Sequence, residues 1–378
     1  MKRSNGGREV TPMEYLTRPQ AETLEQRIIH ALSTGSYTRA ELCSVLGISR
    51  PVLGRALGAL QVQGIVDYLV DPHRRGRGRP VERLTLRAGV VAVLGFDISR
   101  SRALAVAVDH QGFQVAKVAR GRDPSEQWED NLAGLVDALA AQMSDLGLEA
   151  GYVTGIGVGL PVPVGRGDTY ASKVAFLTKR WWKAPVIVDN TIRMAALREA
   201  RDGAGGGIAE QFYVHLGWGV GGSVIVADHV RDGATGYAGE LGHARVPESS
   251  RRCYCGKTGC LETVASIPAV CQAAGVDDLG ALAKAVARGD KKARHALREA
   301  AESVACVSAA VVLLMSPSRV IVGGELPHAC PEIVQDLQDA LAAELIPGVP
   351  WDIEVVPAVL DDDGRAMGAA IAALTYSK

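Results

Sequence analysis

The spacing of apolar positions predicts three short helices near the start of the chain, over residues 23–32, 38–47 and 49–64. Thr38 and Glu41 form a capping-box pattern at the start of the second helix. Glycines end each of the three segments, which is where a helix commonly stops. Two short helices separated by a glycine-containing turn are typical of a helix-turn-helix, whose second helix enters the major groove of DNA.

Two strand candidates, at residues 65–70 and 83–87, follow these helices and bracket an arginine- and glycine-rich segment. Arginines between glycines can follow a phosphate backbone closely, so the segment is interpreted as a basic wing. The alternative is a dimerisation bundle followed by a solvated linker. The residues expected to contact double-stranded DNA are Thr38, Ser49, Arg50, Arg55, Arg74, Arg75, Arg77 and Arg79.

The charge of the chain is divided unevenly. Residues 1–90 carry 14 Lys and Arg against 8 Asp and Glu, whereas the remainder carries 27 against 34. The overall net charge of −1 conceals this asymmetry. Residues 1–90 are thus basic and the rest of the chain is acidic. This asymmetry indicates a polyanionic partner for residues 1–90 alone, and nucleic acid is the expected one.

After residue 88 the pattern changes to apolar strands alternating with helical stretches, which predicts an α/β fold. A second half of similar pattern starts near Phe212 and indicates an internal duplication. We expect a head at 1–88 and a body at 89–378, with lobes at roughly 89–190 and 191–378. No apolar stretch is long enough to span a membrane and the N-terminus lacks a signal-peptide core, so the expected location is the cytoplasm with no membrane partner.

Three of the seven cysteines crowd into eight residues, and a histidine precedes them. Three thiolates and one imidazole form the ligand set of a closed tetrahedral structural zinc site, and glycines in the loop allow the tight turn between ligands. A set of reduced, buried cysteines is the alternative. The expected zinc ligands are His243, Cys253, Cys255 and Cys260. The scattered cysteines, Cys43, Cys271, Cys306 and Cys330, are expected to be small buried apolar residues.

Specific motifs resemble those of the ROK family, which contains repressors and sugar kinases within the actin-like ATPase superfamily. They are Gly239-Glu240-Leu241-Gly242-His243, the Cys253–Glu262 segment, and glycine-punctuated turns after strands. The segment from Ser36 to Val66 resembles the winged helix-turn-helix heads of bacterial regulators. The resemblance implies a two-lobed actin-like (ribonuclease H-like) body whose C-terminal helix returns to the first lobe, behind an all-α, winged helix-turn-helix head.

The resemblance also locates the catalytic base of the sugar kinases, and this chain departs from the pattern there. Where the kinases end the motif in Asp, this chain reads Asp189-Asn190-Thr191. Threonine cannot accept the proton near neutral pH, and Asp189 is expected to face the opposite side. The first phosphate loop lacks its glycines, Trp218 replaces a small residue in the second, and Glu325 adds a charge near the third. We therefore expect no kinase activity.

The residues that bind sugar hydroxyls in the family correspond here to Asn190, Glu240, His243 and Glu262, whereas His215 is interpreted as a satisfied structural histidine. The leading hypothesis is a DNA-binding transcriptional regulator, most simply a repressor, that senses a sugar or related metabolite as a homodimer or homotetramer. One alternative is an ATP-dependent sugar kinase with a DNA-binding head. The other is a constitutive DNA-binding protein whose body is only a dimerisation scaffold.

Overall fold

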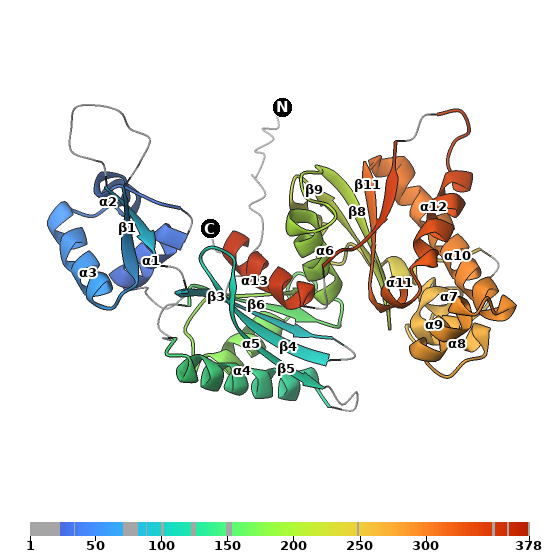
Figure 1. Cartoon of the computed structure of the whole chain (residues 1–378), viewed down its shortest axis with the longest axis horizontal. Helices are drawn as coiled ribbons and strands as arrows, with labels where there is room; N and C mark the ends of the chain where they lie inside the picture. Colours follow the sequence, from blue (N-terminus) through green and yellow to red (C-terminus); the bar gives the residue numbers. More distant parts are fainter. Residues whose placement is uncertain are drawn as a thin grey trace, which may run out of the picture.

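A computed structural model shows an N-terminal head joined to a larger body that has two lobes (Figure 1). Each lobe is built on its own five-stranded sheet. None of the described helices is long and apolar enough to cross a membrane. The structure describes residues 23–33, 35–70, 82–87, 89–99, 102–121, 126–148, 153–247, 249–349, 352–360 and 363–376.

The head contains three helices and a two-stranded antiparallel sheet, as the apolar pattern predicts. The elements are α1 (Leu24–Ser33), α2 (Arg39–Leu46), α3 (Arg50–Val62), β1 (Val66–Val70) and β2 (Glu82–Leu86). The predicted capping box is present, since the Thr38 hydroxyl accepts from the Glu41 N–H and the Glu41 carboxylate accepts from the Thr38 N–H. Gly47 ends α2 in the left-handed conformation at φ 65°.

The first lobe contains a mixed sheet in the order β5-β4-β3-β6-β7. The strands β3 and β4 and the strands β4 and β5 pair antiparallel, whereas β6 lies parallel to both β3 and β7. The strand bounds are β3 (Val91–Ile98), β4 (Arg102–Asp109), β5 (Gln114–Gly121), β6 (Gly155–Leu160) and β7 (Val186–Asn190). The helices α4 (Trp128–Asp145) and α5 (Tyr170–Thr178) belong to this lobe, whereas α6 (Thr191–Asp202) begins where β7 ends and also packs against the sheet of the second lobe.

The second lobe repeats this topology, which confirms the internal duplication. Its sheet has the order β10-β9-β8-β11-β12, again with two antiparallel pairs followed by two parallel ones. The strands are β8 (Glu210–Leu216), β9 (Val220–Val226), β10 (His229–Val230), β11 (Arg319–Gly323) and β12 (Glu354–Pro357). The helices are η2 (Leu241–His243), α7 (Glu262–Ala265), α8 (Ile267–Ala274), α9 (Leu279–Ala287), α10 (Lys291–Met315), α11 (Glu325–Ala329) and α12 (Glu332–Glu344).

The last helix, α13 (Gly364–Tyr376), crosses back to pack on the sheet of the first lobe (Figure 1). Its backbone lies directly against two strand glycines. A Cβ atom at Gly95 would lie 2.0 Å from the Ala366 carbonyl oxygen, and one at Gly157 would lie 1.8 Å from that of Ala369. Only glycine permits this approach, which carries the start of α13 to the cleft between the lobes.

Replacing Gly157 by alanine is therefore expected to destabilise the body. The added methyl group meets backbone rather than a movable side chain, so we expect a loss of about 1–3 kcal/mol, the usual cost of overpacking. Urea unfolding measures it. Gly121→Ala is the matched control, because a Cβ atom on that strand glycine meets nothing within 4 Å. Equal unfolding midpoints for the two variants would contradict the prediction.

Candidate metal centre and ligand cleft

The structure brings the four expected metal ligands together. One ligand atom from each of His243, Cys253, Cys255 and Cys260 lies within 4.8 Å of every other. The Cys253 sulfur lies 3.8 Å from His243 Nδ1, and the Cys255 sulfur lies 3.7 Å from the Cys260 sulfur. Among the described residues this is the one such group of His, Cys, Asp and Glu. The cluster can hold a metal ion, because thiolate and imidazole donors suit a borderline-soft cation.

Local backbone geometry forms the cluster, as the glycines predict. Gly256 and Gly259 have φ angles of 91° and 78°, so the loop turns sharply between the cysteines. The Cys253 N–H donates to the Lys257 carbonyl, which closes the turn. A Cβ atom at Gly259 would lie 2.6 Å from the Ser249 carbonyl oxygen. The sequence therefore determines this turn almost completely within eighteen residues, from 243 to 260.

The surroundings of Cys260 and Cys255 shift the pKa values of their thiols in opposite directions. Burial and the neighbouring thiols of Cys255 and Cys253 raise the pKa of Cys260 to about 12. In the exposed Cys255, by contrast, a hydrogen bond from the Lys257 backbone lowers the pKa. A bound divalent cation would stabilise all three thiolates, since its charge is the largest in such a site.

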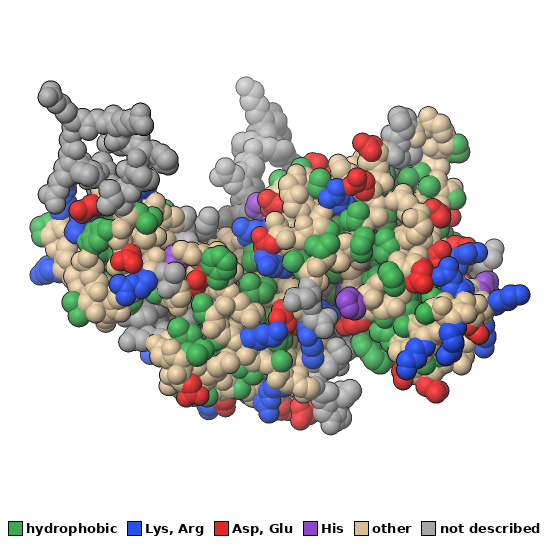
Figure 2. Space-filling model, in the orientation of Figure 1, with side chains coloured by type: hydrophobic (Ala, Val, Ile, Leu, Met, Phe, Trp, Pro, Cys, Tyr) green, Lys and Arg blue, Asp and Glu red, His purple; other side chains and the backbone are tan. Residues whose placement is uncertain are grey.

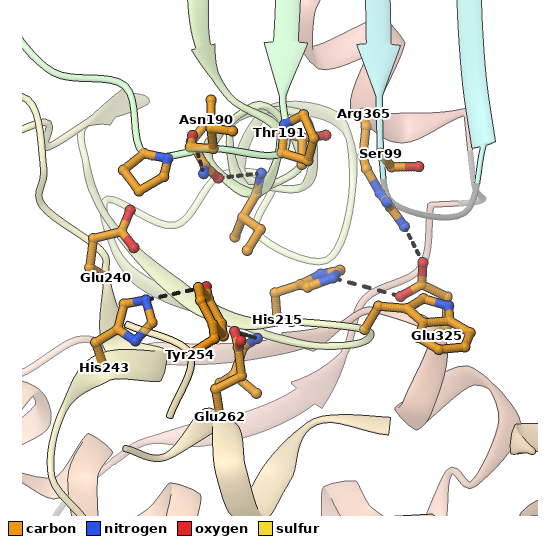
Figure 3. A pocket seen from close by; sticks show the side chains of 17 residues that line it. Ser99, Asn190, Thr191, His215, Glu240, His243, Tyr254, Glu262, Glu325 and Arg365 are labelled. Carbon is orange, nitrogen blue, oxygen red and sulfur yellow. Dashed lines mark hydrogen bonds and ion pairs between the residues drawn. The ribbon is translucent and has the colours of Figure 1, made fainter. Parts of the chain in front are cut away.

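The residues expected to bind a sugar line one cleft between the lobes (Figure 3). Asn190 comes from the first lobe, whereas Glu240, His243 and Glu262 come from the second. The cleft is also lined by Ser99, Pro161, Val162, Pro163, Thr191, Ile192, His215, Trp218, Gly219, Val220, Tyr254, Glu325 and Arg365. Because both lobes contribute polar groups, a molecule bound here would connect them.

These polar groups are held in place by hydrogen bonds. Asn190 caps α6, accepting from the Ile192 N–H and donating to the Val162 carbonyl. Glu262 accepts from the Val220 N–H at 3.0 Å. Burial raises the pKa of Glu240. The cleft thus presents fixed amide and carboxylate oxygens, which suit recognition of hydroxyl groups.

His243 belongs to both the cluster and the cleft. Its Nδ1 atom faces the Cys253 sulfur, whereas Nε2 lies 3.5 Å from the Tyr254 hydroxyl. Both His243 and Tyr254 line the cleft. The resemblance did not single out Tyr254, although its place between two cluster cysteines was a signal that it would lie near His243. A metal on Nδ1 would fix the ring for a ligand at Nε2.

Asp189 and Thr191 face different cavities, although residues two apart on one strand share a face, because β7 ends at Asn190 and Thr191 begins α6. Asp189 forms an ion pair with Arg193 and lines a separate cavity beneath α6. Thr191 faces the cleft, where its hydroxyl donates to the buried Asp97 carboxylate. Burial raises the pKa of Asp97 despite the nearby charge of Arg365. The position that would require a base therefore carries a hydroxyl group already bonded to a carboxylate.

Two of the turns that follow strands use backbone N–H groups internally. In the first, the Ser99 N–H donates to the Arg102 carbonyl at 3.0 Å. In the second, the Gly217 N–H donates to the Gly219 carbonyl at 3.1 Å, and the Val220 N–H is taken by Glu262. Such N–H groups are the ones that hold phosphate oxygens when they are free.

The interpretation of His215 as a satisfied structural histidine is wrong. His215 is buried on β8, but its Nδ1 atom has no hydrogen-bond partner and its Nε2 atom lies 3.7 Å from Glu325 Oε2. Burial, with the nearby Arg365 charge, lowers the pKa of His215 to about 4, so the ring is neutral at neutral pH. Its apolar sequence neighbours gave no sign that the strand ends at the cleft wall.

Arg365 is a cleft residue that the sequence did not reveal. It begins α13, is 9% exposed, and donates to Glu325 Oε1 at 2.9 Å. Burial opposes its charge, but the Asp97 and Glu325 carboxylates raise the pKa of Arg365. Burial also opposes ionisation of Glu325, yet its partners His215 and Arg365 keep the pKa of Glu325 below its ordinary value. The ion pair crosses the cleft from one lobe to the other.

The structure describes four of the eight residues expected to contact DNA. Thr38 caps α2, and Arg50 and Arg55 are exposed on α3. Ser49 occupies the N-cap position of α3, where its side chain makes no capping hydrogen bond, and the residue is exposed. Figure 2 shows Lys and Arg side chains on the surface of the head. Arg74, Arg75, Arg77 and Arg79 lie outside the described residues.

Comparison with known proteins identifies the family. The ROK family matches residues 93–375, which are nearly the whole body. The chain belongs to the ROK family. A glucokinase from Halalkalibacterium halodurans is 32% identical over 206 residues, covering 49% of this chain and 62% of the glucokinase. The DNA-binding transcriptional repressor Mlc of Escherichia coli is 26% identical over 201 residues, covering 50% of each chain.

These two matches leave much of each ROK relative uncovered, between about a third and a half of its length. Among solved structures, a ROK transcriptional regulator described as a homologue of Escherichia coli Mlc has a TM-score of 0.69 and 20% identity. That similarity covers 92% of this chain and 94% of the regulator, and it shows the fold. Kinases and repressors thus both stand among the relatives of this ROK chain.

Proposed function

We propose that this ROK protein is a DNA-binding transcriptional regulator, most simply a repressor, with a winged helix-turn-helix head at residues 1–88 and a kinase-like body at 89–378. The observation that carries the proposal is the exposure of Ser49, Arg50 and Arg55 at the start of α3. In a helix-turn-helix these positions face the base edges of the major groove. The repressor relative supports the same function.

The body is proposed to act as a sensor without phosphorylating its ligand. Thr191 occupies the place of the base, and losing a general base typically costs roughly 10² to 10⁴ in rate. Its hydroxyl is bonded to Asp97, and the nearby turns already use part of their backbone N–H groups. These features favour binding without catalysis.

The ligand is proposed to be a sugar or a related metabolite held by Asn190, Glu240, His243 and Glu262. Because the first of these belongs to one lobe and the others to the second, binding would draw the lobes together. A ligand can shift such an equilibrium only by its differential affinity for the two arrangements. Contacts from both lobes provide that difference.

The cysteine cluster is proposed to hold a structural zinc ion. His243, Cys253, Cys255 and Cys260 would fill all four tetrahedral positions and leave none for catalysis. The ion would fix the loop that carries Glu262 and orient the imidazole of His243 toward the cleft.

The assembly is proposed to be a homodimer or homotetramer. A helix-turn-helix protein reads two half-sites about 34–36 Å apart, one turn of DNA, so a pair of heads is needed.

The experiment that tests the proposal measures binding of the full chain to DNA fragments from its own promoter region, with and without a panel of free sugars. We expect binding that falls steeply with salt, as phosphate contacts require, and that changes with at least one sugar. Binding that is absent, or insensitive to salt, would refute a DNA-binding function. Salt-sensitive binding with no response to any sugar would support the scaffold alternative.

A sugar kinase with a DNA-binding head is the second candidate. The observation that favours it is the Asp97 carboxylate beside Thr191, together with the glucokinase relative. A coupled assay of ATP consumption with a hexose panel separates the two. Robust turnover that is lost in Asn190→Ala would establish the kinase, whereas we expect none above background.

A further inference from the structure

The triad of His215, Glu325 and Arg365 divides the space between the lobes. His215 and Arg365 border two cavities at once. One is the cleft that contains Asn190 and Glu240; the other is a cavity of about 480 Å³ beside Gly323 and Gly324. Figure 3 shows the triad on the side of the cleft opposite His243. A molecule extending from one cavity to the other would have to pass the Glu325 carboxylate.

The Glu325 carboxylate lies against the turn that follows β8. A Cβ atom at Gly217 would lie 2.2 Å from Glu325 Oε2 and 2.7 Å from His215 Nε2. Glu325 Oε2 is buried and has no hydrogen-bond partner among the described residues. The other oxygen, Oε1, accepts from Arg365. The Glu325 carboxylate therefore lies between the turn at Gly217 and the Arg365 guanidinium. An external anion such as a phosphate would need this same space to bind Arg365.

The charge around the cleft is predominantly negative. Glu240, Glu262 and Glu325 line it, and Asp97 lies buried directly behind Thr191. Among the described lining residues Arg365 is the one Lys or Arg, and it is paired with Glu325. An external anion entering the cleft would meet like charges at close range, and the described lining residues offer it no Lys or Arg other than the paired Arg365.

We propose that Glu325 is a specificity-determining residue that acts as an internal anion, so that the cleft accepts uncharged polyhydroxyl ligands and rejects phosphorylated ones. The inference rests on the proposed sensor function for the choice of sugars as ligands. The exclusion of an external phosphate by Glu325 does not depend on DNA binding. The hydroxyl groups of a free sugar can donate hydrogen bonds to the carboxylate and amide oxygens of the cleft, and a free sugar places no negative charge near Arg365.

The test uses the full chain, with calorimetry and intrinsic tryptophan fluorescence as readouts; of the five tryptophans, Trp218 lines the cleft and is 46% exposed. The probes are inorganic pyrophosphate, glucose, N-acetylglucosamine, xylose and the phosphate esters of these sugars. We expect the wild-type protein to bind a free sugar but neither its phosphate ester nor pyrophosphate. Glu325→Ala removes the carboxylate paired with Arg365, leaving Asp97 as its neighbouring carboxylate, and should raise the affinity for pyrophosphate roughly tenfold or more.

Glu302→Ala is the matched control, because it removes an exposed carboxylate on α10 outside the cleft lining, and it should behave as wild type. Glu325→Gln keeps the shape and removes the charge, so a smaller gain is expected even if Glu325→Ala fails to fold. Wild-type binding of pyrophosphate or a sugar phosphate as tight as that of the free sugar would overturn the inference. So would folded Glu325 variants that gain no affinity for pyrophosphate.

The two proposals fail separately. If Glu325→Ala gains pyrophosphate binding while no sugar binds any variant, the internal anion is supported and the sugar sensor is refuted. If a sugar alters DNA binding but pyrophosphate affinity is the same in wild type and the Glu325 variants, the sensor is supported and the internal anion is refuted.

Discussion

Replacing Cys255 by alanine is expected to reduce bound zinc from about one ion per chain to nearly none. Three ligands cannot close the tetrahedral site. Because a bound metal would connect η2 to the loop before α7, we expect the free energy of unfolding to fall by roughly 3 kcal/mol or more. Elemental analysis and thermal unfolding measure the two effects.

The metal variant should also lose affinity for its ligand. The imidazole of His243 faces the Cys253 sulfur with Nδ1 and the Tyr254 hydroxyl with Nε2. Without a metal on Nδ1 the ring is free to rotate, which would misplace Nε2 for the ligand. Cys306→Ala is the matched control, since Cys306 is a partly exposed cysteine of α10 outside the cluster. It should retain zinc and ligand affinity. If the wild-type protein and Cys255→Ala both lack zinc and are equally stable, the zinc site is refuted.

Replacing Arg50 and Arg55 together by alanine is expected to abolish specific DNA binding under physiological salt. Both side chains are exposed on α3, and each good base or phosphate contact contributes about 1–3 kcal/mol. The pair should therefore weaken binding by roughly 10²-fold or more and reduce the salt dependence. Fluorescence anisotropy with a labelled promoter fragment over a salt series measures both quantities.

The matched control is Arg288→Ala, which removes an exposed positive charge at the end of α9 in the body. It should leave affinity and salt dependence unchanged. Circular dichroism of each variant checks that α3 still forms. If the double variant folds and binds as tightly as wild type, α3 is not the recognition helix.

His243 and the Glu325–Arg365 pair lie on opposite sides of the same cleft (Figure 3). A metal in the cysteine cluster would fix His243 on one side, and on the other the Glu325–Arg365 pair connects the second lobe to α13. A sugar between them would contact both lobes, and α13 packs on the sheet of the first lobe. A change in the closure of the lobes would therefore move α13, which packs on β3, the first strand after the head.

Features formed within a short stretch of chain could be predicted from the sequence. The capping box of α2, the turn at Gly47 and the cysteine loop all depend on backbone geometry over a few residues. The different orientations of Asp189 and Thr191 do not follow from the two-residue period of a strand, which would place both on one face; they arise because the chain changes from β7 to α6 between them. The duplicated topology could be predicted too, because the alternation of strands and helices repeats along the chain.

Only the tertiary structure decided which distant charges meet. Arg365 and Glu325 are 40 residues apart, and Thr191 and Asp97 are 94 apart, so no local pattern links them. The Arg365–Glu325 contact arises because α13 returns to the first lobe over glycines that allow backbone to touch backbone, and because both lobes border one cleft. The Thr191–Asp97 contact arises because β6 pairs with both β3 and β7, which brings the ends of those two strands together. Short-range sterics determine helices, strands and turns, but the pairing of buried charges depends on how whole layers pack.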